Sequence, residues 1–232
     1  MKTNIQKAIE NLRPQLRSEN KIIQHDFNFA EQMRIFKKSA GENFDLDQDN
    51  ENVVTLLIHY FNHSAEFEKL QSEQNYKLHK GIMLVGPVGT GKTGLFETFR
   101  EYCKTADLTD ETFRIAKTRD IGKHYMQFQN LNRFTFNEHL TPLNQKTATP
   151  QHWLFDDLGL EPTSIKYYGN EINPTAELML DRYEVFVKSA KKTHITTNLD
   201  ANDIAELYGL RIADRFREMF NVIPLLGASR RK

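Results

Sequence analysis

The chain has 232 residues, with 31 basic and 31 acidic side chains, 39% apolar residues and a mean hydropathy of −0.62. This length suits one α/β domain with a real hydrophobic core, and the 16 phenylalanines exclude a disordered chain. No apolar run approaches the roughly 20 residues that span a bilayer, and the first residues lack the apolar core of a secretory signal. A single cysteine, Cys103, cannot form an internal disulfide, so we expect a cytoplasmic protein with no membrane partner.

The first fifty residues are polar, and their scattered apolar positions predict helices near 3–18 and 28–40. The stretch 41–51 that follows carries five acidic residues and no basic one, which is typical of a solvated linker. We therefore expect residues 1–50 to be a helical extension with an acidic linker, and a candidate for partner binding. Residues 51–232 then form the main domain.

Short apolar runs and helical patterns alternate through the main domain. The apolar runs predict five strands, at 81–85, 113–116, 153–155, 194–197 and 222–225. The helical patterns lie at 53–61, 92–103, 118–129, 175–190 and 201–219, and Pro174 stands where the first turn of one helix begins. Strands that alternate with helices predict an α/β fold, with a parallel sheet covered on both faces.

The first strand is followed by the residues GPVGTGKT, which match the phosphate-binding pattern G-x-x-x-x-G-K-[ST] between a strand and a helix. Glycines let successive backbone N–H groups turn toward phosphates, and the helix N-terminus favours negative charge. Lys92 supplies a cation for the β- and γ-phosphates, and the Thr93 hydroxyl can ligate Mg²⁺. We expect ATP or GTP with Mg²⁺ to bind Gly86, Pro87, Val88, Gly89, Thr90, Gly91, Lys92 and Thr93.

Two carboxylates follow the strand at 153–155. Ligands bind at the C-terminal ends of strands in open α/β sheets, so we expect Asp156 to hold the Mg²⁺ shell and Asp157 to polarise the attacking water. Aspartate is shorter than the glutamate usual at the second position, and Glu161 is the reserve candidate. The alternative interpretation is a solvent-exposed turn with two acids.

Asn198 follows the strand at 194–197. In nucleotidases with a strand inserted between the phosphate loop and the aspartate-bearing strand, a polar residue here lies between the γ-phosphate and the attacking water. An amide suits that place, because it can donate to phosphate and accept from water. The alternative interpretation is an ordinary turn or cap asparagine.

Four segments together resemble the AAA+ ATPases of the DnaC/IstB type, which are bacterial and phage helicase loaders and ATPase helpers of transposition. These segments are 80–93, 155–159, 196–199 and 208–216, and the last is the most specific. The resemblance covers most of the chain from about residue 50, so 51–232 would be an AAA+ ATPase domain. It implies a three-layer P-loop NTPase of the ASCE type with a five-stranded parallel sheet in the order 5-1-4-3-2. It also implies no C-terminal lid domain.

The resemblance further implies assembly into a spiral or ring on a partner. By its match to the family motif, Arg215 would be the arginine finger that reaches a neighbour's γ-phosphate, and Arg211 is a second candidate. A permanently charged, planar guanidinium suits that task. The alternative for Arg215 is a surface pair with an acid such as Glu218, which would contribute little.

Basic and aromatic types interleave between the second and third strands, as they do in proteins that bind single-stranded DNA. The residues are Lys123, Tyr125, Phe128, Arg133, Phe134 and Phe136. Some of these rings share a helix face and are alternatively core residues. Because the net charge is zero, any contact with DNA must come from a local patch such as this one.

The leading interpretation is an ATP-hydrolysing, helicase-loader-like protein that assembles as an ATP-dependent homo-oligomer and delivers a replicative DNA helicase to DNA. Within the same ATPase class, the rival is a helper of a transposase. A small-metabolite kinase would explain the phosphate loop but not Asn198 or the 208–216 segment. A nucleotide-dependent scaffold with little hydrolysis would agree with the shorter Asp157.

Overall fold

The computed structural model describes residues 27–41, 44–135, 150–167 and 170–230, so the helix expected near 3–18 lies outside the described residues. The helices are α2 (Phe29–Ala40), α3 (Glu51–Phe61), α4 (Glu66–Leu70), η2 (Ser72–Gln74), α5 (Lys92–Thr105), η3 (Thr109–Glu111), α6 (Thr118–Phe128), α7 (Asn132–Thr135), α8 (Pro174–Ser189), α9 (Ala201–Tyr208) and α10 (Leu210–Met219). The strands are β1 (Gly81–Val85), β2 (Phe113–Lys117), β3 (His152–Leu158), β4 (Ile165–Tyr167), β5 (Asn170–Ile172), β6 (Thr193–Thr197) and β7 (Phe220–Pro224). Within this part of the chain, no helix is both long and apolar enough to cross a bilayer.

Five strands form one parallel sheet in the order β2-β3-β6-β1-β7. Numbered along the chain without the small β4–β5 pair, these strands have the order 5-1-4-3-2 when read from the other edge. The expected sheet is therefore confirmed. Parallel neighbours need crossover connections, and the helices between the strands provide them.

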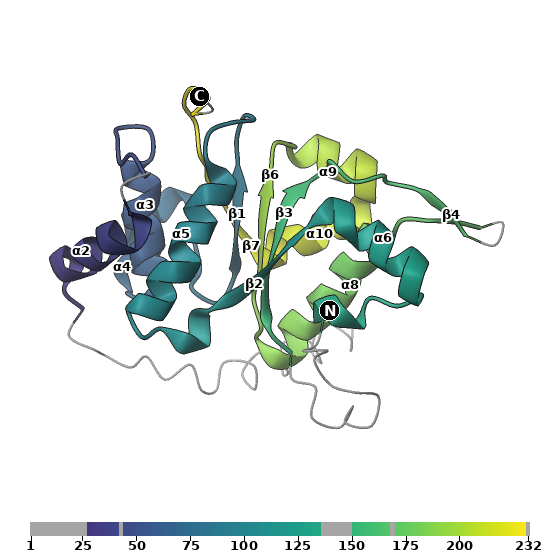
Figure 1. Cartoon of the computed structure of the whole chain (residues 1–232), viewed down its shortest axis with the longest axis horizontal. Helices are drawn as coiled ribbons and strands as arrows, with labels where there is room; N and C mark the ends of the chain where they lie inside the picture. Colours follow the sequence, from purple (N-terminus) through teal and green to yellow (C-terminus); the bar gives the residue numbers. More distant parts are fainter. Residues whose placement is uncertain (1–26, 42–43, 136–149, 168–169, 231–232) are drawn as a thin grey trace, which may run out of the picture.

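Helices cover both faces of the sheet, in three layers (Figure 1). The helices α2, α3 and α5 lie on one face, and α6, α8 and α10 lie on the other. Side chains of β1 alternate between the two cores: Ile82 and Leu84 pack with the cluster of α3 and α5, whereas Met83 packs with the cluster of α8 and α10. Each face of the sheet therefore buries its own hydrophobic core.

The N-terminal helix α2 shares the first of these cores. Phe36 is fully buried, and its ring lies 4.9 Å from that of Phe99 on α5 and 5.4 Å from that of Phe44, measured between ring centroids. A fully buried phenylalanine contributes roughly 1.5–3 kcal/mol of burial free energy. This helix is therefore held against the rest of the described chain by apolar packing.

The helical pattern at 201–219 is divided into two helices at Gly209. Gly209 separates α9 from α10 with a φ of +90°, a conformation that side chains with a Cβ disfavour. The antiparallel β4–β5 pair, which lies between β3 and α8 and extends to one side, is not among the expected strands (Figure 1). Strands of three residues are too short to show an alternating pattern.

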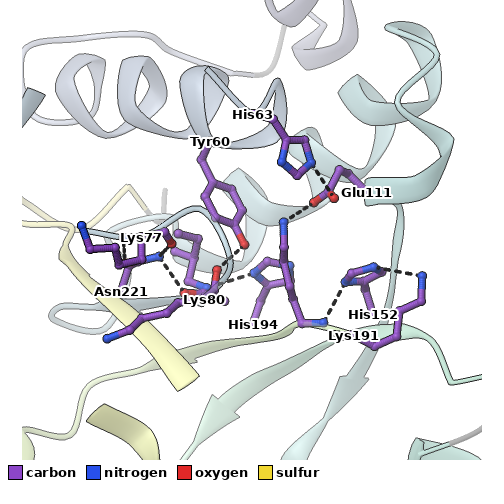
Figure 2. A network of polar contacts seen from close by, with 12 residues as sticks. Tyr60, His63, Lys77, Lys80, Glu111, His152, Lys191, His194 and Asn221 are labelled. Carbon is purple, nitrogen blue, oxygen red and sulfur yellow. Dashed lines mark hydrogen bonds and ion pairs between the residues drawn. The ribbon is translucent and has the colours of Figure 1, made fainter. Parts of the chain in front are cut away.

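A polar network is buried at the end of the sheet where the strands β3 and β6 begin (Figure 2). The Glu111 carboxylate lies 2.8 Å from the ring of His63 and 2.8 Å from the ammonium group of Lys192. Burial alone would raise the pKa of Glu111, but the charges of Lys192 and His63 outweigh it and hold the pKa well below its usual range. The buried acid is therefore paired, as the cost of burying a lone charge requires.

Two histidines beside this network are buried in the neutral form. The Nδ1 atom of His152 accepts a hydrogen bond from the Lys192 backbone N–H (2.9 Å), and that of His194 accepts one from Ile82 (3.1 Å). Burial lowers the pKa of His152 to about 3, and it lowers the pKa of His194 well below its ordinary value. Protonating either ring would break an acceptor contact inside the core.

These histidines predict that acid destabilises the fold. As the pH is lowered from 6.5 to 5, the unfolded chain protonates both rings and the folded chain does not. The free energy of unfolding therefore decreases as the pH decreases. At pH 5 the loss relative to pH 7 is about 2 kcal/mol for each ring. Denaturant titrations at the two pH values measure it, and His152→Asn, which keeps an acceptor but does not titrate, should reduce the loss. Equal stability at both pH values would contradict this.

Candidate nucleotide-binding site

The loop between β1 and α5 has the conformation that phosphate binding needs. Gly89 and Gly91 have φ values of +89° and +92°, in the left-handed region that favours glycine. Gly91 is the N-cap of α5, and no side chain caps this helix start. The first N–H groups of a 14-residue helix are thus left for an anion.

Lys92 lies inside this loop. Its side chain is 7% exposed, and Nζ donates to the carbonyl oxygens of Gly86 (2.7 Å) and Pro87 (2.8 Å). An ammonium group has three donors and no acceptor, so phosphate oxygens can replace these carbonyls as its partners. The structure thus places the expected cation within the curve of the loop.

Asp156 joins the loop to the sheet. The side chain is 1% exposed, and its Oδ1 accepts hydrogen bonds from the hydroxyls of Thr93 and Thr196, both at 2.7 Å. Residues of α5, β3 and β6 therefore meet at one carboxylate oxygen. A hydroxyl and a carboxylate are oxygen ligands of the kind that Mg²⁺ prefers, so Thr93 and Asp156 fit the expected metal.

Asp157 lies in a local irregularity of β3. The pairing of β3 with β6 shifts register between Phe155 and Leu158, and Asp157 has a φ of +61°. Its N–H donates to the Thr196 hydroxyl and its C=O accepts from the Thr118 hydroxyl, both at 2.8 Å. Bulges commonly re-aim a side chain beside an active site, and here two threonines fix the backbone of the irregular residue.

The two other polar candidates differ in their surroundings. Asn198 is exposed immediately after β6 and forms no side-chain hydrogen bond with a described residue. Glu161 is buried, and its carboxylate accepts from the Gly159 N–H (2.9 Å) and from the Tyr208 hydroxyl. Burial and the Glu161 charge raise the pKa of Tyr208. Both oxygens of the reserve candidate thus hold the loop after β3 to α9.

The arginines on α10 do not contact the phosphate loop within the described part of the single chain. Arg215 donates to the Tyr183 hydroxyl (3.1 Å) and lies 3.4 Å from Glu218, with its guanidinium 4.3 Å from the centroid of the Tyr183 ring. This is the surface pair considered above as the alternative. Arg211, one turn earlier on α10, is exposed and forms no ion pair with a described residue.

The C-terminal segment covers part of the loop, which the sequence analysis did not anticipate. The Arg230 N–H donates to the Gly89 carbonyl (2.9 Å), and a Cβ on Gly89 would lie 2.3 Å from the Ser229 hydroxyl. The Arg230 guanidinium pairs with Asp47 (2.7 Å), and this hydrogen-bonded pairing lowers the pKa of Asp47. The acidic stretch, expected as a solvated linker, is exposed at Asp47 but tied to the tail.

The contacts of Thr196, of Thr118 and of the C-terminal segment were thus not predicted from the sequence. Only Thr196 could have been found from its position in the sequence. It stands two residues before Asn198, on a strand that the implied sheet order places beside β3. Thr118 lies 39 residues from Asp157 in sequence, and no local pattern links them.

The expected DNA-binding cluster is divided by the structure. Phe134 is 3% exposed and Tyr125 is partly buried against the same core, so these rings are packing residues. Phe128 and Arg133 are exposed, and Lys123 pairs with Asp120 (3.1 Å). Phe136 lies outside the described residues.

No protein-family model and no curated protein sequence matches this chain. Among solved structures, the crystal structure of DnaI aligns over 85% of this chain and 93% of its own, with a TM-score of 0.51 and 19% identity. A candidate primosome component from Streptococcus pyogenes serotype M3 aligns over 84% and 92%, with a TM-score of 0.53 and 14% identity. The DnaC helicase loader aligns over 82% and 98%, at a TM-score of 0.48 and 20% identity. The chain therefore shares the fold of the DnaI structure, as the resemblance of its motifs predicted.

Proposed function

We propose that this chain is an ATP-hydrolysing protein of the helicase-loader kind, which assembles with ATP and delivers a replicative DNA helicase to DNA. The observation that carries the proposal is the contact between the Thr93 hydroxyl and Asp156 (2.7 Å), beside a loop that already encloses Lys92. The motif resemblance and the fold shared with DnaI support the helicase as partner.

The residues of the site have distinct roles in this proposal. The N–H groups of the loop and Lys92 bind the phosphates, and Thr93 and Asp156 hold Mg²⁺, which supplies positive charge at the phosphates. Asp157 accepts the proton of the attacking water as oxygen bonds to the γ-phosphorus and the bond to the bridging oxygen breaks. Asn198 is exposed at the end of β6, the strand that pairs with β3, and it orients that water through its amide.

Arg215 completes the site of a neighbouring copy. For this, its guanidinium must leave Glu218, an exposed pair that costs little to break. Tyr183 contacts the guanidinium through its ring and its hydroxyl. Activity then depends on assembly, because no single chain holds the whole site.

The first prediction concerns nucleotide binding. Lys92→Ala removes charge-assisted hydrogen bonds to phosphate, which are worth about 1.5–3 kcal/mol, so ATP affinity should fall roughly 10- to 100-fold. Isothermal titration with ATP and Mg²⁺ measures this. Lys188→Ala, which removes an exposed lysine paired with Glu184, is the matched control and should bind as wild type does. If the Lys92→Ala protein is folded and its affinity for ATP is unchanged, this loop is not the ATP-binding site.

Partner choice is tested with purified proteins. The full chain is mixed with the replicative helicase of its own genome, and separately with a transposase, and sized with and without ATP. An ATP-dependent complex with the helicase, lost in Lys92→Ala, is the expected result. A complex with the transposase alone would assign the chain to transposition. The extension 1–50 is our candidate for the helicase contact. Because Phe36 of α2 is fully buried in the core, the deletion is confined to residues 1–26, and it should abolish the complex while ATP binding remains.

A further inference from the structure

A cavity of about 640 Å³ lies at the outer edge of the sheet, away from the phosphate loop. Three successive residues of the edge strand β2 line it, together with residues of α5, α6, α7 and β3. Trp153, the least exposed ring of the described lining, stands three residues before Asp156 on β3, which is about 10 Å along the strand. The cavity is therefore separate from the site described above.

The lining of this cavity is positively charged. Arg100, Arg114 and Arg133 contribute guanidinium groups, and the described residues that line the cavity include no aspartate or glutamate. Arg133 is exposed and forms no ion pair with a described residue, whereas Arg100 forms a long ion pair with Glu101, with 3.6 Å between Nε and the carboxylate. A ligand with negative charge would be attracted here.

Polar nitrogen atoms without partners gather at the same place. Among the described residues, four buried side-chain nitrogen or oxygen atoms have no hydrogen-bond partner, and three of them belong to Arg100, His124 and Trp153 of this lining. Trp153 is 3% exposed and His124 is 8% exposed. Buried donors are nearly always satisfied in native proteins, so their concentration here points to acceptor atoms of a ligand.

A flat apolar surface completes the cavity. Phe128 is 51% exposed, and its ring centroid lies 4.6 Å from that of His124. The Arg114 guanidinium lies 5.8 Å from the Trp153 ring centroid on the neighbouring strand. Exposed rings beside cations are the combination on which nucleic-acid bases stack while phosphates are neutralised.

We propose that this cavity binds a nucleotide unit, with its phosphate at the arginines and its base against Phe128, independently of the phosphate loop. The source is either a free nucleotide or one residue of a single-stranded DNA. The volume falls within the range of small-ligand sites. An acidic peptide would also neutralise the arginines, but it would leave the exposed Phe128 ring without a flat partner.

The test uses the full chain carrying Lys92→Ala, so that the phosphate loop does not contribute. Binding of dTMP is measured by titration calorimetry, and binding of fluorescein-labelled dT20 and of fluorescein-labelled oligoglutamate is measured by anisotropy at low salt. Phe128→Ala and Arg133→Ala change exposed residues, which seldom affect folding, and circular dichroism checks the fold. Met126→Ala and Arg119→Ala are the controls, because both residues are exposed on α6 and neither lines the cavity.

We expect Phe128→Ala and Arg133→Ala each to weaken binding about tenfold or more, while both controls bind as the parent protein does. If the two variants weaken the binding of both probes, the cavity binds nucleotide units in general. If they weaken only the binding of dT20, the ligand is the DNA strand, and if they weaken only the binding of dTMP, it is the free nucleotide. With Lys92 intact, the two variants should keep wild-type ATP hydrolysis without DNA, which separates this inference from the ATPase proposal. Equal binding by variants and controls, absence of binding of both probes, or binding of oligoglutamate alone would overturn it.

Discussion

We expect Arg215→Ala to bind ATP as the wild type does and to hydrolyse it roughly a thousandfold more slowly, which is the scale of arginine fingers in phosphoryl transfer. The reason is that the guanidinium would act on the charge developing at a neighbour's γ-phosphate and not on ground-state binding. Titration with ATP separates affinity from turnover, and phosphate release at a protein concentration that favours assembly measures turnover.

The surroundings of Arg215 supply its controls. Arg217→Ala changes an exposed arginine of the same helix and should leave turnover unchanged. Tyr183→Phe keeps the ring under the guanidinium but removes the hydroxyl that Arg215 contacts, so a loss below tenfold is expected. If Arg211→Ala gives the thousandfold loss and Arg215→Ala does not, the finger is Arg211 and the pairing of Arg215 with Glu218 is only structural.

The second large effect is expected at Asp157. Asp157→Asn should retain ATP binding and lose at least about a hundredfold in hydrolysis, because an amide cannot accept the proton of the attacking water. Asparagine is the suitable substitution, since it tolerates the φ of +61° that the bulge imposes, whereas alanine would add backbone strain. Single-turnover hydrolysis measures the chemical step directly.

Two further variants test whether Asp157 itself is the base. Asp157→Glu introduces the longer acid that is usual at this position in the ATPases that the motifs resemble. It should retain part of the hydrolysis, because the acid is kept while the φ of +61° strains glutamate more than aspartate or asparagine. Glu161→Gln keeps one acceptor oxygen for the Gly159 N–H, and its amide NH₂ can donate to the Tyr208 hydroxyl oxygen, so it should hydrolyse ATP as the wild type does. Hydrolysis that persists in Asp157→Asn but disappears in Glu161→Gln would move the base to Glu161.

The fold could be predicted from the sequence because each main strand is followed by a recognisable helix or motif. The phosphate loop after 81–85 marks the C-terminal end of β1, and the family resemblance supplied the order of the strands. The acids expected after 153–155 lie within the last three residues of β3, which continues to Leu158. The β4–β5 pair was not predictable, because three-residue strands carry no periodic signal. Gly209 was visible in the sequence, but its left-handed backbone was not.

The candidate site could be predicted only in part, for a physical reason. Its loop is a continuous stretch whose residue types follow from phosphate chemistry, and Lys92 lies where that chemistry requires. Thr196 and Thr118 hold Asp157 from segments that are each 39 residues away, and such contacts arise from sheet packing. Arg230 reaches Asp47 across 183 residues, so neither the tail nor the acidic stretch could indicate the pairing alone.

The central claim is that ATP is hydrolysed where two copies of this chain meet, and mixing two inactive variants tests it most directly. Arg215→Ala has an intact phosphate loop with Asp156 and Asp157, and Lys92→Ala has an intact finger. In a mixed assembly, some interfaces join a working loop to a working finger, so part of the wild-type hydrolysis should return when the two proteins are combined. If sizing shows that the variants assemble together and no activity returns, Arg215 does not act across the interface, and the claim is wrong.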